Sequence, residues 1–235
     1  MAAYTRLMLA LALVPLFAQK PVDGFQARIY KTLPYRLYIP PNYDSARKYP
    51  VVLYLHGSSG IGADNLKQIS GTSVRGTRTW TASKVQAKYP TFVLAPQASG
   101  ESWMREFPTI LELLESLETE FSIDTARIYV VGQSMGGFGT WALIRVRPDV
   151  FAAAIPLCGG GNPFRANRIA QIPIWAFHGD ADPTVSVEES RRMIAAIRQV
   201  GGSPRYTEYK GVGHDVWNKA FQEKELVDWL FSQHK

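Results

Sequence analysis

Apolar residues along the chain form short continuous runs that alternate with stretches of helical spacing. Runs such as 49–56 and 127–131 are apolar at nearly every position, which is typical of strands buried on both faces of a sheet. Apolar residues at three- and four-residue spacing predict helices over 110–121, 134–147, 186–200 and 219–231. The expected strands are two antiparallel strands within 27–39, then 49–56, 90–95, 127–131, 151–157, 173–178 and 205–209.

This alternation of strands and helices predicts the α/β fold class, with a mostly parallel central sheet and helices on both faces. A chain of 235 residues is long enough for one such domain and too short for two. Ligands of parallel sheets bind beyond the carboxyl ends of the strands. Residues that carry chemistry are therefore expected directly after strands.

The first eighteen residues have the organisation of a secretory signal peptide. Arg6 precedes an apolar run over 7–17, and the small residue Ala18 follows the run. This run is shorter than a membrane-spanning helix needs to be. We expect cleavage after Ala18, a single catalytic domain over 19–235, and a secreted or periplasmic protein with no stable membrane insertion. An uncleaved membrane anchor and a misassigned start codon are the alternatives.

Composition removes several classes of function. The formal net charge is +6, but the basic residues are scattered instead of being concentrated on one element, so nucleic acid is not an expected partner. The single cysteine, Cys158, can form neither an internal disulfide nor a cysteine-rich metal site, and its apolar neighbours indicate a small buried side chain. No His-x-His or His-Glu-x-x-His spacing occurs, so we expect no metal and no cofactor.

The strongest chemical motif is Gly132-Gln133-Ser134-Met135-Gly136, which directly follows an expected strand and directly precedes an expected helix. In this context a Gly-x-Ser-x-Gly sequence places the serine on a sharp turn that exposes its hydroxyl group. The two glycines are needed because larger side chains would collide with neighbouring backbone. We predict that Ser134 is the nucleophile of a serine hydrolase.

A serine nucleophile needs a base, and the chain has only four histidines. His234 is next to the last residue, and terminal residues are poorly held. His56 and His178 each end a buried strand before a glycine, where we expect them to shape the turn. His214 lies in a glycine-rich loop after the last expected strand, and we predict that it is the base.

The acid that orients the base is expected between Ser134 and His214 in the chain order of this kind of site. Asp180 and Asp182 both follow the strand over 173–178. Asp182 is favoured because its position further along the loop lets it reach a distant imidazole, whereas Asp180 is expected to bind loop backbone. Asp215 is adjacent to His214 and is expected to point away from it.

An oxyanion hole requires two backbone N–H groups close to the nucleophile. Met135, the residue after the nucleophile, is the first candidate donor. The second is expected in the loop His56-Gly57-Ser58-Ser59-Gly60, which follows a buried strand. We assign the second donor to Ser58, with Ser59 as the alternative.

With these residues in place, the sequence resembles the carboxylesterase and dienelactone-hydrolase branch of the α/β-hydrolase superfamily, near bacterial feruloyl esterases and polyhydroxybutyrate-depolymerase-related esterases. The resemblance implies the triad Ser134, Asp182 and His214 in a carboxylic ester hydrolase that acts on a small-molecule ester through an acyl-enzyme. Ser59 stands where many relatives have glycine. The resemblance rests on His56-Gly57-Ser58, Ala95-Pro96-Gln97, Gly132-Gln133-Ser134-Met135-Gly136-Gly137, Cys158-Gly-Gly-Gly161, His178-Gly179-Asp180-Ala181-Asp182 and Gly213-His214-Asp215.

Only some fifteen residues separate the expected strands over 151–157 and 173–178, where larger lipases of this fold carry a lid. The absence of room for a lid domain predicts an open site that suits short-chain or bulky, aryl-type esters. Trp103 and Trp217 are the candidate substrate-binding residues, with Phe107 as a further aromatic side chain near them. A serine peptidase of the same fold and a non-catalytic ligand-binding protein are the alternative functions.

Overall fold

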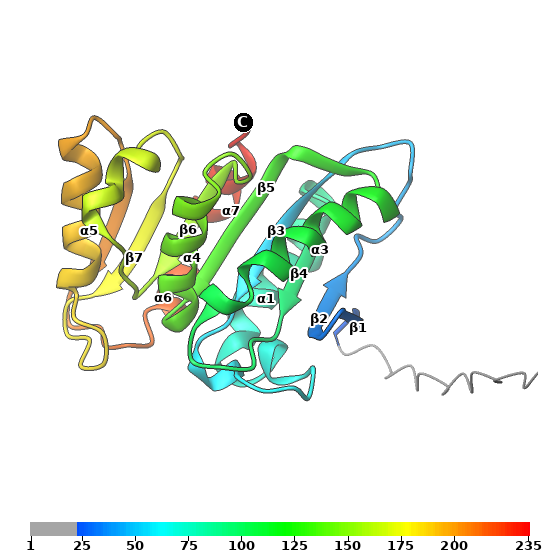
Figure 1. Cartoon of the computed structure of the whole chain (residues 1–235), viewed down its shortest axis with the longest axis horizontal. Coiled ribbons are helices and arrows are strands. Elements are labelled where there is room, and N and C mark those ends of the chain that lie inside the picture. The colour runs from blue at the N-terminus through cyan, green and yellow to red at the C-terminus, as the bar shows by residue number, and fades with distance from the viewer. Residues whose placement is uncertain (1–22) are drawn as a thin grey trace, which may run out of the picture.

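A sheet of eight strands runs through the centre of the structure and separates two layers of helices (Figure 1). This computed structural model describes residues 23–235, so the signal peptide expected over 1–18 lies outside the described residues. The strands follow one another across the sheet in the order β1-β2-β4-β3-β5-β6-β7-β8. Their bounds are β1 Phe25–Tyr30, β2 Leu33–Tyr38, β3 Tyr49–Leu55, β4 Phe92–Pro96, β5 Ile123–Gln133, β6 Ala153–Leu157, β7 Trp175–Gly179 and β8 Arg205–Tyr209.

Antiparallel pairing is confined to one edge of the sheet. β1 pairs antiparallel with β2, and β2 pairs antiparallel with β4, whereas all other neighbouring strands are parallel. In the central strand β3, Leu53 pairs with Leu94 of β4 and with Val130 of β5. Every residue of β3 is buried, as its uninterrupted apolar sequence predicts. The expected α/β class and mostly parallel sheet are therefore confirmed.

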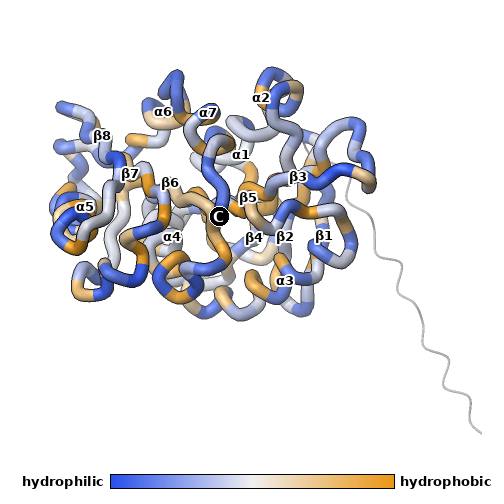
Figure 2. Tube along the Cα trace, turned by 90° about the horizontal axis from the view of Figure 1, so that it is seen from above, coloured by the Kyte–Doolittle hydropathy of each residue, from blue (hydrophilic) through white to orange (hydrophobic). Residues whose placement is uncertain are grey.

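Helices cover both faces of this sheet. α3, α4 and α5 lie on one face, and α1, α2, α6 and α7 lie on the other, as two perpendicular views show (Figures 1 and 2). Each face has its own hydrophobic core because the strands are buried on both sides. The bounds are α1 Val74–Thr81, α2 Ser83–Lys88, α3 Phe107–Glu120, α4 Met135–Val146, α5 Glu188–Gln199, α6 Trp217–Ala220 and α7 Leu226–Phe231.

Short 3₁₀ helices occupy several loops between these elements. Within residues 23–235, no helix combines the length and the apolarity that crossing a lipid bilayer requires. The 3₁₀ helices are η1 Ser58–Gly60, η2 Lys67–Ile69, η3 Gly71–Ser73, η4 Trp103–Arg105 and η5 Pro163–Arg168.

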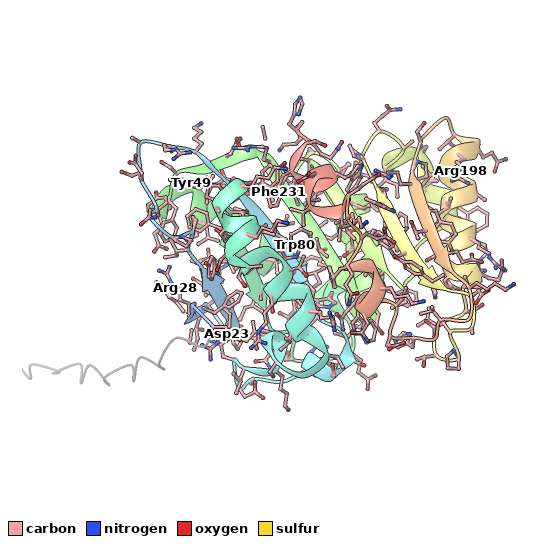
Figure 3. All side chains as sticks on the ribbon, turned by 180° about the vertical axis from the view of Figure 1, so that it is seen from behind. Asp23, Arg28, Tyr49, Trp80, Arg198 and Phe231 are labelled. Carbon is pink, nitrogen blue, oxygen red and sulfur yellow. The ribbon has the colours of Figure 1, made fainter. Side chains whose placement is uncertain are left out.

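The prediction of a single helix over 219–231 is wrong, because two short helices, α6 and α7, occupy this part of the chain. The segment 222–225 between them reads Gln-Glu-Lys-Glu and offers no apolar side chain to the core. Interrupting the helix there lets Phe231 of α7 pack edge-on against Trp80 of α1, with 6.2 Å between ring centroids, on the face seen in Figure 3. Helices α1 and α2 have no counterpart among the elements predicted from the sequence.

Candidate active site

The turn between β5 and α4 holds Ser134 in a backbone conformation that is rare for a residue with a side chain. Its φ is 54° and its ψ is −118°. A Cβ atom on Gly132 would lie 2.1 Å from the Gly136 carbonyl oxygen, and one on Gly136 would lie 1.9 Å from the Leu55 carbonyl oxygen. Both positions therefore require glycine, for the steric reason that the sequence motif indicates.

The structure brings together the three side chains that the sequence selects as nucleophile, base and acid. Nε2 of His214 lies 2.8 Å from Ser134 Oγ, and Nδ1 of His214 lies 2.7 Å from Asp182 Oδ2. The partners assign the protons: the Nδ1–H group donates to the carboxylate, and the Ser134 hydroxyl donates to the unprotonated Nε2. The three residues come from loops after β5, β7 and β8, at the carboxyl ends of parallel strands.

The side chain of Asp182 is fully buried and is held as a carboxylate. Its Oδ1 accepts backbone N–H groups of Thr184 at 2.8 Å and of Val185 at 2.9 Å, while Oδ2 accepts from His214. Burial by itself raises the pKa of Asp182, but the hydrogen bonds from Val185, His214 and Thr184 outweigh it and lower the pKa below its usual range. The acid therefore stays ionised beside the imidazole.

A second histidine lies behind this carboxylate. His178 is fully buried, and its Nε2 lies 3.0 Å from the Val185 carbonyl oxygen and 3.3 Å from Asp182 Oδ2. Nε2 therefore carries the proton, and Nδ1 faces the Ser190 hydroxyl at 2.7 Å. Burial lowers the pKa of His178, which favours the neutral ring.

The other two aspartates considered from the sequence make local contacts away from the imidazole. Asp180 Oδ1 accepts the backbone N–H group of Gly211 at 2.6 Å, which ties the loop after β7 to the loop after β8. Asp215 Oδ2 accepts the side-chain amide of Asn218 at 2.9 Å. Only Asp182 among the three is hydrogen-bonded to His214 in the described part of the chain.

His56 fixes the loop that carries the candidate oxyanion donor. Its Nε2 accepts the backbone N–H group of Ala98 at 3.0 Å, so Nδ1 carries the proton and donates to the Gly57 carbonyl oxygen at 2.6 Å. The Gly57–Ser58 peptide is trans, so the Ser58 N–H group points away from that clamped carbonyl group. A Cβ atom on Gly57 would lie 3.5 Å from Ser134 Cβ, which places this loop against the nucleophile.

Burial of His56 predicts a loss of stability in mild acid. Desolvation lowers its pKa to about 4 from 6.5, so between these values the unfolded chain binds a proton that the folded chain does not. The free energy of unfolding should therefore fall by about 3 kcal/mol as the pH drops from 7.5 towards 4, with a further loss from His178. Urea unfolding at several pH values measures this change. A free energy of unfolding that is constant over this range would contradict a neutral, buried His56.

Two cavities lie near the catalytic side chains, one on each helical layer: Met135, next to Ser134, lines the first, and Trp217, which packs against His214, lines the second. The first has a volume of about 470 Å³ and lies along α4, between that helix, the segment 101–104 and the segment 160–162. The second has a volume of about 680 Å³ and lies between α1, α6 and the segment 71–72. We call them the α4 groove and the α6 groove.

The predicted substrate-binding tryptophans divide between these grooves. Trp103 is almost fully buried, lines the α4 groove, and donates from Nε1 to the His56 carbonyl oxygen at 3.1 Å. Trp217 lines the α6 groove and packs edge-on against His214, with ring centroids 5.5 Å apart. Phe107 is buried in the hydrophobic core on the α3–α5 face of the sheet. Both tryptophans thus combine a packing role with one wall of a groove.

The polar contacts that hold the segment 71–73 close to the nucleophile were not predicted from the sequence. The Tyr54 hydroxyl donates to Gln133 Oε1 at 2.6 Å, and Gln133 Nε2 donates to the Thr72 carbonyl oxygen at 3.4 Å. The Thr72 hydroxyl also bonds the Ser59 hydroxyl at 2.6 Å. A polar residue at the buried end of an apolar strand, Gln133, is the one signal that could have indicated this network.

One group of side chains in the described part of the chain places metal-ligand types close together. Cys158 Sγ, a carboxylate oxygen of Asp182 and a ring nitrogen of His214 lie within 4.8 Å of one another. A thiol binds metal as the thiolate, and burial raises the pKa of Cys158, which disfavours that form. Asp182 and His214 already satisfy each other, so we assign this group no metal.

Comparison with known proteins identifies the family. The family described as putative esterase matches residues 27–194. A probable feruloyl esterase C from Aspergillus terreus is 27% identical over 179 residues, covering 72% of this chain and 62% of its own. An uncharacterized secreted protein from Arthroderma benhamiae is 25% identical over 212 residues, covering 74% of this chain and 22% of its own.

A solved structure agrees with this match. The crystal structure of a thermostable esterase superposes with a TM-score of 0.87 at 37% identity, covering 91% of this chain and 64% of that one. The chain therefore spans somewhat less than two thirds of the length of both the feruloyl esterase and the thermostable esterase. From the family match, the strand order and the strained serine turn, we conclude that this chain belongs to the putative esterase family and has the α/β-hydrolase fold.

Proposed function

We propose that the protein is a serine carboxylic ester hydrolase, with Ser134 as nucleophile, His214 as base and Asp182 as the acid that orients it. The observation that carries the proposal is the continuous hydrogen-bonded chain from Ser134 Oγ through the His214 ring to Asp182 Oδ2. These two hydrogen bonds allow His214 to remove the proton of the Ser134 hydroxyl while the Asp182 carboxylate stabilises the resulting imidazolium. The family match supports the reaction class.

In the acylation step, His214 Nε2 takes the proton of Ser134 as Oγ forms a bond to the ester carbonyl carbon. The carbonyl electrons move to oxygen and form a tetrahedral oxyanion. When it collapses, the bond to the alcohol oxygen breaks and that oxygen takes the proton from His214. In deacylation a water molecule repeats the sequence, which releases the carboxylic acid and returns the proton to Ser134.

We propose that the oxyanion is stabilised by the backbone N–H groups of Met135 and Ser58. Met135 is the first residue of α4, so its N–H group has no partner within the helix and faces the end where the helix dipole is positive. Ser58 is favoured over Ser59 because the contact of His56 with Gly57 fixes the direction of the Ser58 N–H group. His56 is then a positioning residue for the oxyanion loop.

Export of the protein is also part of the proposal. The pattern of Arg6, the apolar run over 7–17 and Ala18 supports a secretory signal. The relative from Arthroderma benhamiae is described as secreted, which agrees with this reading. We propose a secreted or periplasmic enzyme whose mature chain begins after Ala18.

Short-chain or bulky, aryl-type esters are the proposed substrates. Only the short helix η5 lies between β6 and β7, which leaves no room for a lid there. One relative is described as a probable feruloyl esterase, and this similarity supports aryl esters as substrates. Hydrolysis of 4-nitrophenyl acetate, butyrate and octanoate by residues 19–235 tests this proposal. We expect turnover that falls from acetate to octanoate. Absence of turnover on all three esters, with normal hydrolysis of a peptide substrate, would replace the esterase by the peptidase alternative.

A further inference from the structure

The position of His214 assigns the two grooves to the two halves of an ester. His214 returns its proton to the leaving alcohol, so that alcohol must lie on the imidazole side of Ser134. Trp217, which packs against His214, lines the α6 groove. Met135 is the first residue of α4, on the opposite face of the sheet from α6, and it lines the α4 groove. The acyl group therefore extends into the α4 groove, an assignment that rests on the proposed function.

The floor of the α4 groove is one face of its helix. Met135, Phe138, Ala142 and Arg145 recur at three- and four-residue spacing and all line the groove. At 1.5 Å per residue, the distance from Met135 to Arg145 along the helix axis is about 15 Å. Phe138 is 39% exposed, so the first turns present an apolar surface to the groove. The helical floor of the groove is thus apolar at Met135, the residue next to the nucleophile, and ends at the cation Arg145.

Arg145 is partly buried and has no ion partner among the described residues. Its neighbour Arg147, outside the groove, pairs with Asp149 at 2.7 Å. Glu101 is the one acidic residue that lines the groove; it is exposed and lies two positions before Trp103, whose ring packs beside Gly139 of α4. The carboxylate of Glu189 lies beside Gly160 of the wall, but it is paired with Arg192. Gly139 lies about 9 Å before Arg145 along the helix axis. The contact of Trp103 with Gly139 thus keeps the Glu101 segment away from Arg145, and the end of the groove at Arg145 is positively charged.

We propose that the α4 groove binds an extended apolar acyl chain that ends in a carboxylate, with Arg145 as the residue that selects this charged end. A guanidinium group can bind a carboxylate through two parallel hydrogen bonds, and partial burial strengthens that pair. A neutral chain of the same length would cover the guanidinium without replacing its water, which is unfavourable. The inferred substrate class is therefore the monoester of a long dicarboxylic acid. Its charged end makes it an exception to the fall in turnover from acetate to octanoate that we expect for neutral acyl chains.

This preference is tested with 4-nitrophenyl esters of twelve-carbon acyl chains whose far end is either a carboxylate or a carboxamide. The two ends have nearly the same size, so the comparison isolates charge. We expect the carboxylate ester to have a kcat/KM about tenfold higher, and this ratio to fall to about one in Arg145→Gln. Arg147→Gln makes the same charge change at the residue that directly follows this helix, outside the groove, and should keep the full ratio.

The control substrate is 4-nitrophenyl acetate, which is too short to reach Arg145 and should be hydrolysed equally by all three proteins. Equal rates on acetate with no preference for the carboxylate in the wild type would overturn the assignment of Arg145 and leave the esterase intact. No hydrolysis of acetate would instead refute the proposed function. A preference that Arg145→Gln and Arg147→Gln reduce equally would show that only net charge matters.

Binding without turnover provides an independent readout. Calorimetric titration of Ser134→Ala with dodecanedioate, the product of the proposed substrate, should give an affinity about tenfold higher than the same titration of Ser134→Ala combined with Arg145→Gln. Equal affinities would contradict a carboxylate site at Arg145. Arg145 also lies in the last turn of α4, so thermal unfolding of both variants separates a loss of stability from a loss of binding.

Discussion

Replacing Ser134 with alanine is expected to lower kcat/KM for 4-nitrophenyl acetate by about 10⁵- to 10⁶-fold. The alanine methyl group cannot form the acyl-enzyme. The oxyanion donors and His214 remain, but the protein no longer supplies a nucleophile for them to assist. The side chain of Ser134 makes its hydrogen bond to His214 and has no packing role in the core. Steady-state kinetics together with thermal unfolding should show lost activity in a protein of nearly unchanged stability.

Ser203→Ala is the matched control, because Ser203 is exposed in the loop before β8. We expect its kcat/KM to equal that of the wild type. Residual activity of Ser134→Ala within about tenfold of the wild type would mean that another group attacks the ester, since loss of a true nucleophile costs far more.

Asp182→Asn is expected to lower kcat by about 10⁴-fold, the second largest effect. If the asparagine amide faces the ring, it donates to Nδ1 and forces the proton onto Nε2, which then cannot accept the Ser134 proton. The substitution also removes the negative charge that stabilises the imidazolium. Oδ1 can still accept the N–H groups of Thr184 and Val185, so the loop should keep its conformation. Kinetics across the pH range, with unfolding as a check on stability, measures this effect.

Asp180→Asn is the control for this variant, two residues away in the same loop. An asparagine there can keep the contact with the Gly211 N–H group, so we expect a kcat within about threefold of the wild type. If Asp180→Asn were the inactive variant and Asp182→Asn the active one, the acid would have been assigned to the wrong carboxylate.

Local sequence determined the nucleophile turn and most of the sheet. The Gly-x-Ser-x-Gly motif is a short-range steric requirement, and its two glycines lie where any Cβ atom would meet backbone. The continuous apolar runs predicted the strands because strands buried on both faces leave no polar positions. His214 could be selected because the chain offers so few histidines. Asp182 could be selected because of the chain order of such sites and because it lies further along the loop than Asp180.

Features that depend on distant parts of the chain could not be predicted. The interruption between α6 and α7 serves the packing of Phe231 on Trp80, residues about 150 positions apart. The role of Gln133 depends on Tyr54 and Thr72, which only the fold brings to the nucleophile. Arg145 could not be singled out either, because its sequence context is that of an ordinary basic residue near a helix end.

The most direct test of the central claim is covalent labelling with diethyl 4-nitrophenyl phosphate, followed by mass spectrometry of the digested protein. A serine activated by His214 should attack phosphorus and release 4-nitrophenolate, which leaves one diethylphosphoryl group per chain. We predict that this group is found on Ser134, and that Ser134→Ala takes up no label. A label on another residue, or an active esterase that remains unlabelled, would contradict the assignment of Ser134 as the nucleophile.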